Sequence, residues 1–339
     1  MKDFNQKQKM MILRILRDAK EPIGSAAIAE EMKNYGFDLC GRTIRLYLQE
    51  MEKEGVVTST RRGRDGGRAI TPQGLEEIHD AMVNERVGFM AGKMDALACQ
   101  MTFNPASRNG LVVVNVTIID RTHLVSAARE MMPVFRAKLG MGDYIVLARA
   151  GEQLGGFYIP PGKVGVGTMC SVTINGLFLA ARIPMTSVFG GVLEINEGRP
   201  FRFTDLIYYN GTSLDPLEIF IKGKLTSVRE AARTGHGRIG ASMREVPSPA
   251  FKKLEKLRRQ LDDLGLGGGL FLGKPHQSLL DFPIEEGRMG LIVTGGLNPL
   301  AAVEEAGIPT ANYALASLID FEKMIHYKEL PHLIEQEEF

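Results

Sequence analysis

The chain has 339 residues, of which 44% are apolar, and this is enough for two or three domains with proper cores. The formal net charge of +1 excludes a uniformly basic nucleic-acid-binding protein, so any contact with nucleic acid must come from a local concentration of charge. The sequence has no apolar run of about 18 residues, no signal-peptide core and no cluster of histidines and cysteines at metal-ligand spacing. We therefore expect a cytoplasmic protein without membrane contact, metal or cofactor.

The first 81 residues predict three helices followed by a β-hairpin, which is the order of a winged-helix domain. Apolar residues recur at helical spacing in three segments, residues 7–19, 21–36 and 40–55. The inner positions expected for the third helix are Ile44, Leu46, Leu48 and Met51. Residues 56–71 then alternate apolar and polar side chains around the turn signal RDGG, which predicts the hairpin. We expect a DNA-binding domain over residues 1–81, with its third helix in the major groove.

Basic and polar side chains gather where such a domain would touch DNA. On the third helix, the side chains able to reach base edges or phosphates are Arg42, Thr43, Arg45 and Gln49. The hairpin carries four arginines against one aspartate, and these are Arg61, Arg62, Arg64 and Arg68. Because each phosphate contact adds affinity, the hairpin predicts a clamp on the backbone of double-stranded DNA. A winged helix used only for protein contact is the alternative.

The rest of the chain contains an internal repeat. We expect a helical connector over residues 82–107 and one domain over 108–330. A shift of 125 residues aligns 139–184 without a gap, with 12 identities in 46 positions where chance gives about 3. The two copies span about 111–195 and 236–320. They predict an α/β (α+β) regulatory domain built from two similar halves around a pseudo-twofold axis, with a ligand site between them.

A glycine-rich turn occupies the same place in each half. KVGVGTM runs into CSVTINGLFLAA in the first half, and RMGLIVT runs into GGLNPLAAVEEAG in the second. Each predicts a strand, a small polar turn and a short helix, whose free N–H groups suit a carboxylate or a phosphate. In the second copy, Asn298 is expected to cap the helix. Glycines needed only for turn geometry are the alternative.

Cys170, at the end of the first of these strands, allows two other interpretations. As a nucleophile it would need a base and an orienting group, and no recognised nucleophile motif surrounds it. In G-V-G-T-M-C it stands where the third glycine of a dinucleotide fingerprint belongs, which disfavours cofactor binding. Arg244, in the expected strand GASMREVP, suits pairing with a carboxylate of a ligand or of the protein itself.

Several long motifs together resemble the nitrogen regulatory repressor family, NrpR. They are GKVGVGTMCSVTINGLFLAARIPMTSVFGGVLEI, YNGTSLDPLEIFI, GASMREVP and GGLNPLAAVEEAGIP, and the resemblance covers essentially the whole chain. It implies a repressor of nitrogen-fixation and nitrogen-assimilation genes that binds inverted-repeat operators as a homodimer and loses DNA affinity when it binds 2-oxoglutarate. Some members carry two regulatory domains in tandem. One is expected here, so a second chain with such a domain is another expected partner.

Together, the resemblance and the polar turns indicate an effector site. Its expected residues are Cys170, Ser171, Thr173, Asn175, Gly176, Thr212, Ser213, Asp215, Arg244, Thr294, Gly295, Gly296 and Asn298. No residue is expected to be catalytic. The competing hypotheses are an enzyme with a winged-helix module that uses Cys170 or Asp215, and a scaffold whose α/β portion only dimerises.

Overall fold

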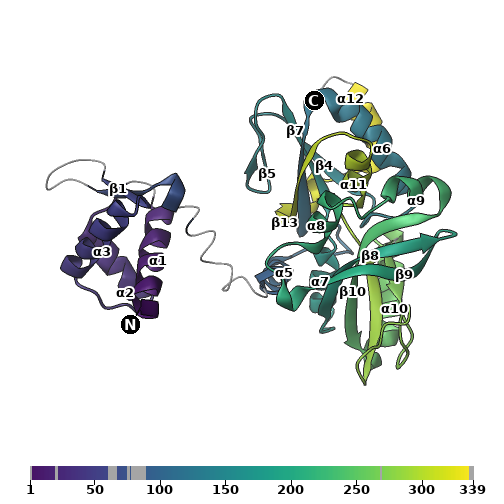
Figure 1. Cartoon of the computed structure of the whole chain (residues 1–339). Helices are drawn as coiled ribbons and strands as arrows, with labels where there is room; N and C mark the ends of the chain where they lie inside the picture. The colour runs from purple at the N-terminus through teal and green to yellow at the C-terminus, as the bar shows by residue number, and fades with distance from the viewer. Residues whose placement is uncertain are drawn as a thin grey trace. The chain divides into compact units, whose positions relative to one another are not determined.

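The structure is a computed structural model, and it describes residues 2–19, 22–59, 67–74, 77, 89–267 and 269–335. The chain divides into two compact units, Met1–Arg86 and Val87–Phe339, each with its own hydrophobic core (Figure 1). Three of the predicted hairpin arginines, Arg61, Arg62 and Arg64, lie outside the described residues.

The first unit is a winged helix, as predicted. Its elements are α1 (Lys2–Asp18), α2 (Ser25–Asn34), α3 (Gly41–Lys53), β1 (Val57–Ser59) and β2 (Arg68–Ile70). Apolar side chains spaced three or four residues apart meet in one core, which contains Ile12, Leu16, Ile28, Met32, Ile44, Leu48 and Met51. The two strands pair antiparallel with Val57 opposite Ile70, and Val57 adds to this core.

One residue expected in this core lies outside it. Leu46 is 58% exposed, whereas Ile44 and Leu48 on either side of it are buried. Successive helix residues are turned by about 100°, so a residue two positions from both buried neighbours faces away from the core. The prediction of Leu46 as an inner residue is therefore wrong, because it counted apolar residues without their phase around the helix.

In the described part of the second unit, the longer strands form two five-stranded antiparallel sheets. The first has the order β13-β3-β7-β4-β14, formed by Thr310–Asp320, Leu111–Asp120, Lys163–Met169, Tyr144–Ala148 and Ile325–His326. The second has the order β11-β12-β10-β8-β9, formed by Leu270–Leu272, Arg288–Thr294, Gly237–Pro247, Thr186–Asn196 and Arg199–Tyr208. A short hairpin of β5 (Gln153–Leu154) and β6 (Phe157–Tyr158) lies between β4 and β7 in the chain.

Helices flank these sheets. They are α5 (Phe89–Gln100), α6 (Leu124–Arg136), α7 (Val172–Ala180), α8 (Pro216–Lys222), α9 (Val228–Thr234), α10 (Phe251–Asp263), α11 (Asn298–Glu305) and α12 (Leu330–Glu335). Apolar faces of α6 and α10 show why they pack: Met131 of α6 and Leu261 of α10 are both completely buried. A 3-10 turn, Tyr209–Gly211, precedes α8.

The same order of elements occurs twice in this unit. The first half runs β3-α6-β4-β7-α7-β8, and the second runs β10-α10-β11-β12-α11-β13. The segments KVGVGTM and RMGLIVT form β7 and β12 with the expected bounds. The halves exchange their last strands, because β8 pairs with β10 and β13 pairs with β3. Each sheet is therefore built from both halves, which ties them into one folding unit.

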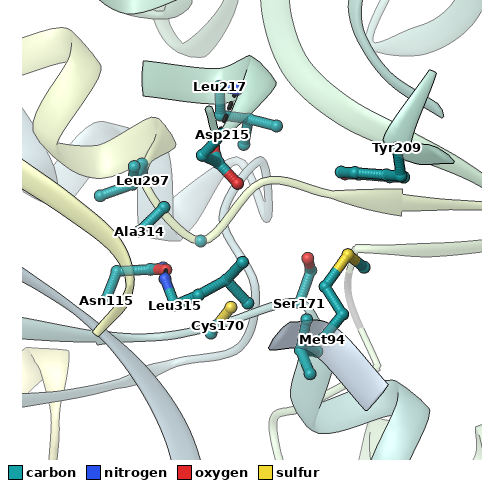
Figure 2. Close-up of a pocket in the computed structure, with 12 residues that line it drawn as sticks. Met94, Asn115, Cys170, Ser171, Tyr209, Asp215, Leu217, Leu297, Ala314 and Leu315 are labelled. Atoms are coloured by element: carbon teal, nitrogen blue, oxygen red, sulfur yellow. Dashed lines mark hydrogen bonds between the residues drawn. The ribbon is translucent and has the colours of Figure 1, made fainter. Parts of the chain in front are cut away.

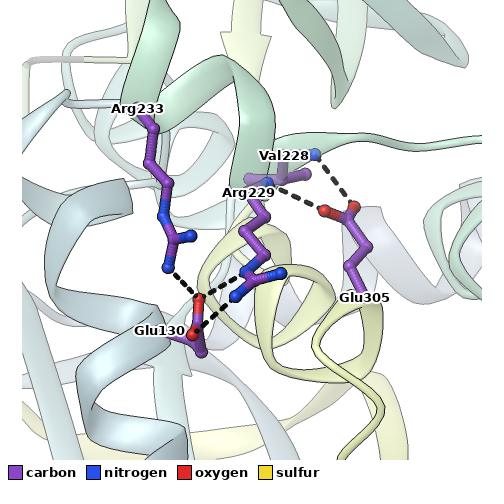
Figure 3. A network of polar contacts seen from close by, with 5 residues as sticks. All are labelled: Glu130, Val228, Arg229, Arg233 and Glu305. Atoms are coloured by element: carbon purple, nitrogen blue, oxygen red, sulfur yellow. Dashed lines mark hydrogen bonds and ion pairs between the residues drawn. The ribbon is translucent and has the colours of Figure 1, made fainter.

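The insertion between the halves contributes β9, α8 and α9, and a polar network anchors α9 (Figure 3). The carboxylate of Glu305, at the end of α11, accepts hydrogen bonds from the backbone N–H groups of Val228 (2.9 Å) and Arg229 (2.8 Å). The Arg229 guanidinium donates to Glu130 of α6 at 2.8 and 3.2 Å, and Arg233 donates to the same carboxylate at 2.7 Å. Glu305 satisfies N–H groups that open a helix, so α9 is held by one helix from each half.

Candidate functional site

A small cavity lies where the two halves meet (Figure 2). Its wall includes Cys170, Ser171 and Val172 after β7, and Gly296 and Leu297 after β12. The other lining residues come from α5, β3, the insertion and β13, and are Met94, Asn115, Tyr209, Asp215, Leu217, Ala314 and Leu315. The cavity volume is about 20 Å³, which is room for about one water molecule. The two glycine-rich turns of the repeat thus face each other across one cavity.

Glycine at position 296 lets the two turns approach closely. A β-carbon there would lie 2.0 Å from the carbonyl oxygen of Met169 and 2.5 Å from the side-chain nitrogen of Asn115. Both distances are far inside van der Waals contact, and the Met169 oxygen belongs to the backbone of β7, so it has no rotamer that would relieve the clash. The second turn therefore touches the end of β7 directly, as glycine alone permits.

A bulge in β13 forms another part of the wall. The pairing of β13 with β3 loses its register around Leu315, whose φ is 50°. The N–H group of Leu315 donates to Oδ1 of Asn115 at 3.2 Å, and the N–H group of Ala314 donates to the carboxylate of Glu218. Side chains thus replace ladder hydrogen bonds that the bulge removes. The bulge brings the backbone of the second half's last strand into the cavity wall.

Arg244 of β10 lies behind this wall and is fully buried, with 0% exposure. Its guanidinium donates to the carbonyl (3.0 Å) and hydroxyl (2.9 Å) oxygens of Ser171. It also donates to the hydroxyl of Ser242 at 3.2 Å and to the amide oxygen of Asn175. These acceptors are all neutral, and no carboxylate of the described residues forms an ion pair with Arg244. Burial lowers the pKa of this group, yet arginine stays charged in proteins, so the site holds a buried cation without a counter-anion.

Asp215 directs its carboxylate into the cavity from the side opposite Ser171 (Figure 2). The same side chain caps α8, accepting from the N–H groups of Leu217 at 2.9 Å and Glu218 at 3.3 Å. Burial, followed by the nearby charge of Glu218, raises the pKa of Asp215 to about 7. Burial also raises the pKa of Tyr209. Near neutral pH, the carboxyl group in this wall is therefore readily protonated or deprotonated. It accepts hydrogen bonds as a carboxylate and can donate one as a carboxylic acid.

Cys170 lines the cavity, but its thiol lacks the environment of a nucleophile. It is buried in an apolar cluster with Met90, Met94 and Leu315. Burial raises the pKa of this thiol to about 11, and the charge of Asp215 acts in the same direction. A reactive cysteine needs the opposite shift, which stabilises the thiolate. The geometry therefore disfavours the alternative in which Cys170 attacks a substrate.

Other residues predicted for the effector site form hydrogen bonds within the protein and do not line the cavity. Side-chain groups of Thr173, Thr294 and Asn298 donate hydrogen bonds to main-chain oxygens. Asn298 does not cap α11 as expected, since Leu297 occupies the cap position. The Asn298 amide instead accepts from the N–H of Gly240 and donates to its carbonyl, both at 2.9 Å, and so ties α11 to β10.

The predicted glycine and turn positions are also divided between structural roles and the cavity wall. A β-carbon at Gly176 would lie 2.6 Å from Met101, so this glycine allows close packing against α7. The Thr212 hydroxyl closes the turn before α8 by bonding the backbone of Leu214. The predicted positions outside the cavity wall are Thr173, Asn175, Gly176, Thr212, Ser213, Arg244, Thr294, Gly295 and Asn298. Those that line it are Cys170, Ser171, Asp215 and Gly296.

Sequence reasoning missed Val172 and Leu297 in the turns, Tyr209 and Leu217 in the insertion, and the cavity residues that lie outside both. Asn115 carried a usable signal, because it interrupts the apolar run LVVVNV and a buried amide needs hydrogen-bond partners. Met94 carried none, since methionine in an apolar helix is ordinary core. The positive φ of Leu315 follows from the bulge and has no local sequence mark.

Helix α5 covers the cavity from one side. Its buried face presents Met90 and Met94 to the cluster that contains Cys170, Val172 and Leu315. Helix α5 joins neither sheet, and the N–H group of Met90 near its start donates to the carbonyl oxygen of Thr212 at 3.5 Å. It is also the first described element of the second unit, and thus follows the winged helix in the chain.

The outer face of α3 in the first unit carries the predicted DNA-reading side chains. Arg42, Arg45 and Gln49 are exposed and share one helix face at positions i, i+3 and i+7. In the described part of the chain, no hydrogen bond or ion pair engages these three side chains. Thr43 is half-buried, and its hydroxyl lies 3.3 Å from the sulfur of Cys40. Among the described residues, this face of α3 is therefore exposed and its polar side chains are unengaged.

Arg68, the described member of the hairpin arginines, is engaged within the unit. Its guanidinium donates to the hydroxyl of Ser59 at 3.0 Å and lies 3.3 Å from the carboxylate of Glu52. Arg68 therefore ties β2 to β1 and to α3.

The two units define a class of protein, namely a winged helix followed by a duplicated α/β domain with a small cavity between its halves. In the ranges that the structure covers, no helix is both long and apolar enough to cross a bilayer. Over the same ranges, no three side chains of the metal-binding types come together.

Comparison with known families agrees with this class. Residues 87–326 match the family described as NrpR regulatory domains NRD1 and 2. Residues 10–78 match the family described as the Ribonuclease R winged-helix domain. The chain belongs to the NrpR family, as its motifs predicted.

Individual relatives bear the name of this family. The chain is 35% identical over 319 residues to the global nitrogen regulator NrpRI of Methanosarcina mazei, covering 94% of this chain and 97% of that protein. It is 27% identical over 314 residues to the global nitrogen regulator NrpR of Methanococcus maripaludis, covering 92% of this chain and 54% of that protein. The crystal structure of a nitrogen repressor-like protein from Methanococcus jannaschii superimposes with a TM-score of 0.59 at 28% identity, covering 70% of this chain and 97% of that one.

Proposed function

We propose that this chain is a transcriptional repressor of nitrogen-assimilation and nitrogen-fixation genes. Its winged helix binds an inverted-repeat operator as part of a homodimer, and 2-oxoglutarate in the cavity between the halves lowers its affinity for DNA. The names of the relatives support the regulatory role. The observation that carries the effector proposal is Arg244, a buried cation that has no counter-anion among the described residues and lies one hydrogen bond behind the cavity wall.

A small dicarboxylate matches the chemistry of this wall. One carboxylate would take up the place beside Ser171, where Arg244 supplies the charge that the protein itself leaves uncompensated. At the other side, the carboxyl group of Asp215 would donate a hydrogen bond in its protonated form. An anion nearby favours that form, so binding is expected to take up a proton.

The size of the cavity means that the effector must change the structure when it binds. A volume of about 20 Å³ is far too small for 2-oxoglutarate, so the effector must bind an arrangement in which the walls have moved apart. A ligand shifts an equilibrium between two arrangements by the difference in its affinities for them. A coupling of about 1–3 kcal/mol would change operator affinity by about 5- to 150-fold.

Helix α5 is the wall we expect to move. The other walls belong to strands, or to segments that hydrogen bonds fix to strands, whereas α5 joins neither sheet and is held by packing of side chains such as Met90 and Met94 and by a hydrogen bond of 3.5 Å from the N–H group of Met90 to the carbonyl of Thr212. It also lies next to the winged helix along the chain, so its displacement can alter how the two DNA-binding units of a dimer are presented.

The test uses the full chain, a duplex that it selects from a random DNA pool, and 2-oxoglutarate. Binding of the effector is measured by calorimetry, and release of the duplex by fluorescence anisotropy. Glutarate, which lacks the keto group, and glutamate, which carries an ammonium group, serve as comparison ligands. We expect 2-oxoglutarate to release the duplex most effectively.

Two variants locate the site. Arg244→Gln should still bind the duplex but fail to respond to the effector. Arg238→Gln, an exposed arginine on the same strand, should behave like the unmodified chain. No heat and no release at millimolar 2-oxoglutarate would contradict the proposal, as would an unaltered response of Arg244→Gln.

A further inference from the structure

Besides its arginines, the outer face of α3 carries a large apolar side chain. Leu46 is 58% exposed and lies at i+4 from Arg42, beside Arg45 and at i−3 from Gln49. At these spacings of four and three, Arg42 and Gln49 are the neighbours of Leu46 on the helix surface. We call the four residues Arg42, Arg45, Leu46 and Gln49 the α3 stripe. The side chains of the polar members of the stripe form no hydrogen bond or ion pair among the described residues.

The fold of the first unit does not require a leucine at this position. Ile44, Leu48 and Met51 fill the inner face of α3 and are buried. In the described part of this unit, the other exposed large hydrophobic residue is Tyr35, which ends α2 and is not part of the stripe. A polar residue would be an equally good helix former at an exposed site, so a leucine here suits contact with an external apolar group.

The major groove offers one apolar group that distinguishes bases. Arginine reads guanine and glutamine reads adenine through paired hydrogen bonds, whereas thymine is marked by its C5-methyl group, which apolar side chains contact. The stripe holds side chains suited to all three of these modes. Its apolar member lies between the polar ones, in the part of the helix that would face the base edges.

We propose that Leu46 contacts the methyl group of a thymine in the major groove and so selects thymine at one position of each operator half-site. This inference rests on the proposed DNA-binding function and names a base that the recognition helix selects. Removing one methyl group from an apolar contact loses the transfer free energy of about one CH₂-sized group, which corresponds to a three- to fivefold change in affinity, roughly, per half-site.

The experiment replaces thymine by deoxyuridine, one position at a time, in a duplex that the full chain has selected from a random pool. This change removes the methyl group and keeps every hydrogen-bonding group of the base pair. We expect one thymine in each half-site whose replacement lowers the affinity of the unmodified chain about three- to fivefold. Leu46→Ala removes the contact in both half-sites at once, so it should lose affinity for the thymine duplex by about the product of two such factors, roughly nine- to 25-fold, and no longer distinguish the two duplexes. Leu46→Met should keep the distinction.

Two matched variants separate this contact from general effects. Gln49→Ala should weaken binding while keeping the difference between thymine and deoxyuridine at that position. Tyr35→Ala, which removes the other exposed hydrophobic side chain, should bind both duplexes like the unmodified chain. Because Leu46 is exposed, thermal unfolding of Leu46→Ala should match that of the unmodified chain.

Each failure has a distinct meaning. If the chain selects a duplex but no thymine methyl affects binding, or if Leu46→Ala keeps the full distinction, the inference is overturned while DNA binding stands. A change in oligomeric state with the distinction intact also overturns it, since the leucine then serves contact between copies. If the chain selects no duplex at all, the proposed function itself fails.

Discussion

Replacing Asp215 by asparagine should stabilise the protein at neutral pH and have little effect in acid. Burial raises the pKa of this carboxyl group from 3.8 to about 7, with Glu218 contributing next. The folded protein therefore keeps a proton up to about pH 7 that the unfolded chain releases near pH 3.8. The sign follows directly. Stability is fully present below pH 3.8 and is lost as the pH rises through the folded-state pKa.

The size of the effect follows from the same shift. The difference between the pKa of 3.8 in the unfolded chain and about 7 in the folded protein corresponds to about 4 kcal/mol of stability lost between strong acid and pH 8. Of this loss, about 2–3 kcal/mol occurs between pH 5 and pH 8. Asparagine has no charge to bury and is as good a helix cap as aspartate, so the bonds to the N–H groups of Leu217 and Glu218 are kept. Asp215→Asn should therefore not lose this stability as the pH rises, and α8 should stay capped.

The assay is urea unfolding of both proteins at several values between pH 5 and pH 8. We expect the free energies of unfolding to diverge by about 2–3 kcal/mol over this range, with Asp215→Asn the more stable. Asp263→Asn, which changes an exposed carboxylate on α10, is the control and should show no such divergence. A separation between Asp215→Asn and the unmodified chain that stays constant with pH would refute the argument, because it would show that this carboxyl group titrates alike in both states.

Four further outcomes are expected. Affinity for 2-oxoglutarate should fall as pH rises from about 6 to 8, because the buried carboxyl group of the cavity must hold its proton beside an anion; calorimetry in buffers of different ionisation enthalpy counts that proton, and a flat profile would contradict this. Gly296→Ala should lower the free energy of unfolding by roughly 1–3 kcal/mol through its clash with β7, whereas Gly92→Ala, with open space around it, should be neutral or slightly stabilising. Cys170→Ser should keep DNA binding with a changed effector response, and a loss of DNA binding would argue against its place in the effector wall. Arg42→Ala with Arg45→Ala should reduce the slope of log affinity against log salt by up to about two, and an unchanged slope would mean that neither arginine meets a phosphate.

Local pattern predicted the elements of this fold more reliably than their pairing. The segments that form β7 and β12 have the expected bounds, because alternation and glycine-rich ends mark them locally. The exchange of β8 and β13 between the halves was not predicted. Strand pairing depends on which edges are free once the core has formed, and the local sequence of a strand does not identify its partner.

The residues of the candidate site were likewise predicted only where a local pattern in the sequence marks them. Cys170, Ser171 and Gly296 were found together, because the repeat marked both turns and the cavity lies between them. Met94 and Leu315 were missed, since the first lies on a helix outside the repeat and the second reaches the cavity through a bulge. Such contributions come from the packing of distant segments, and a single sequence carries no periodic signal for them.

The two turns that meet at the cavity have diverged in a way that suits one ligand rather than two. Cys170 and Ser171 of the first turn correspond to Gly295 and Gly296 of the second. The glycines give close approach of the backbones, while the first turn supplies the polar groups that hold Arg244, a residue of the second half. Because the halves exchange their last strands, each turn follows a strand of a sheet that contains strands of both halves. A ligand held between the turns therefore acts on the whole domain, whereas one bound to a single half would act on that half alone.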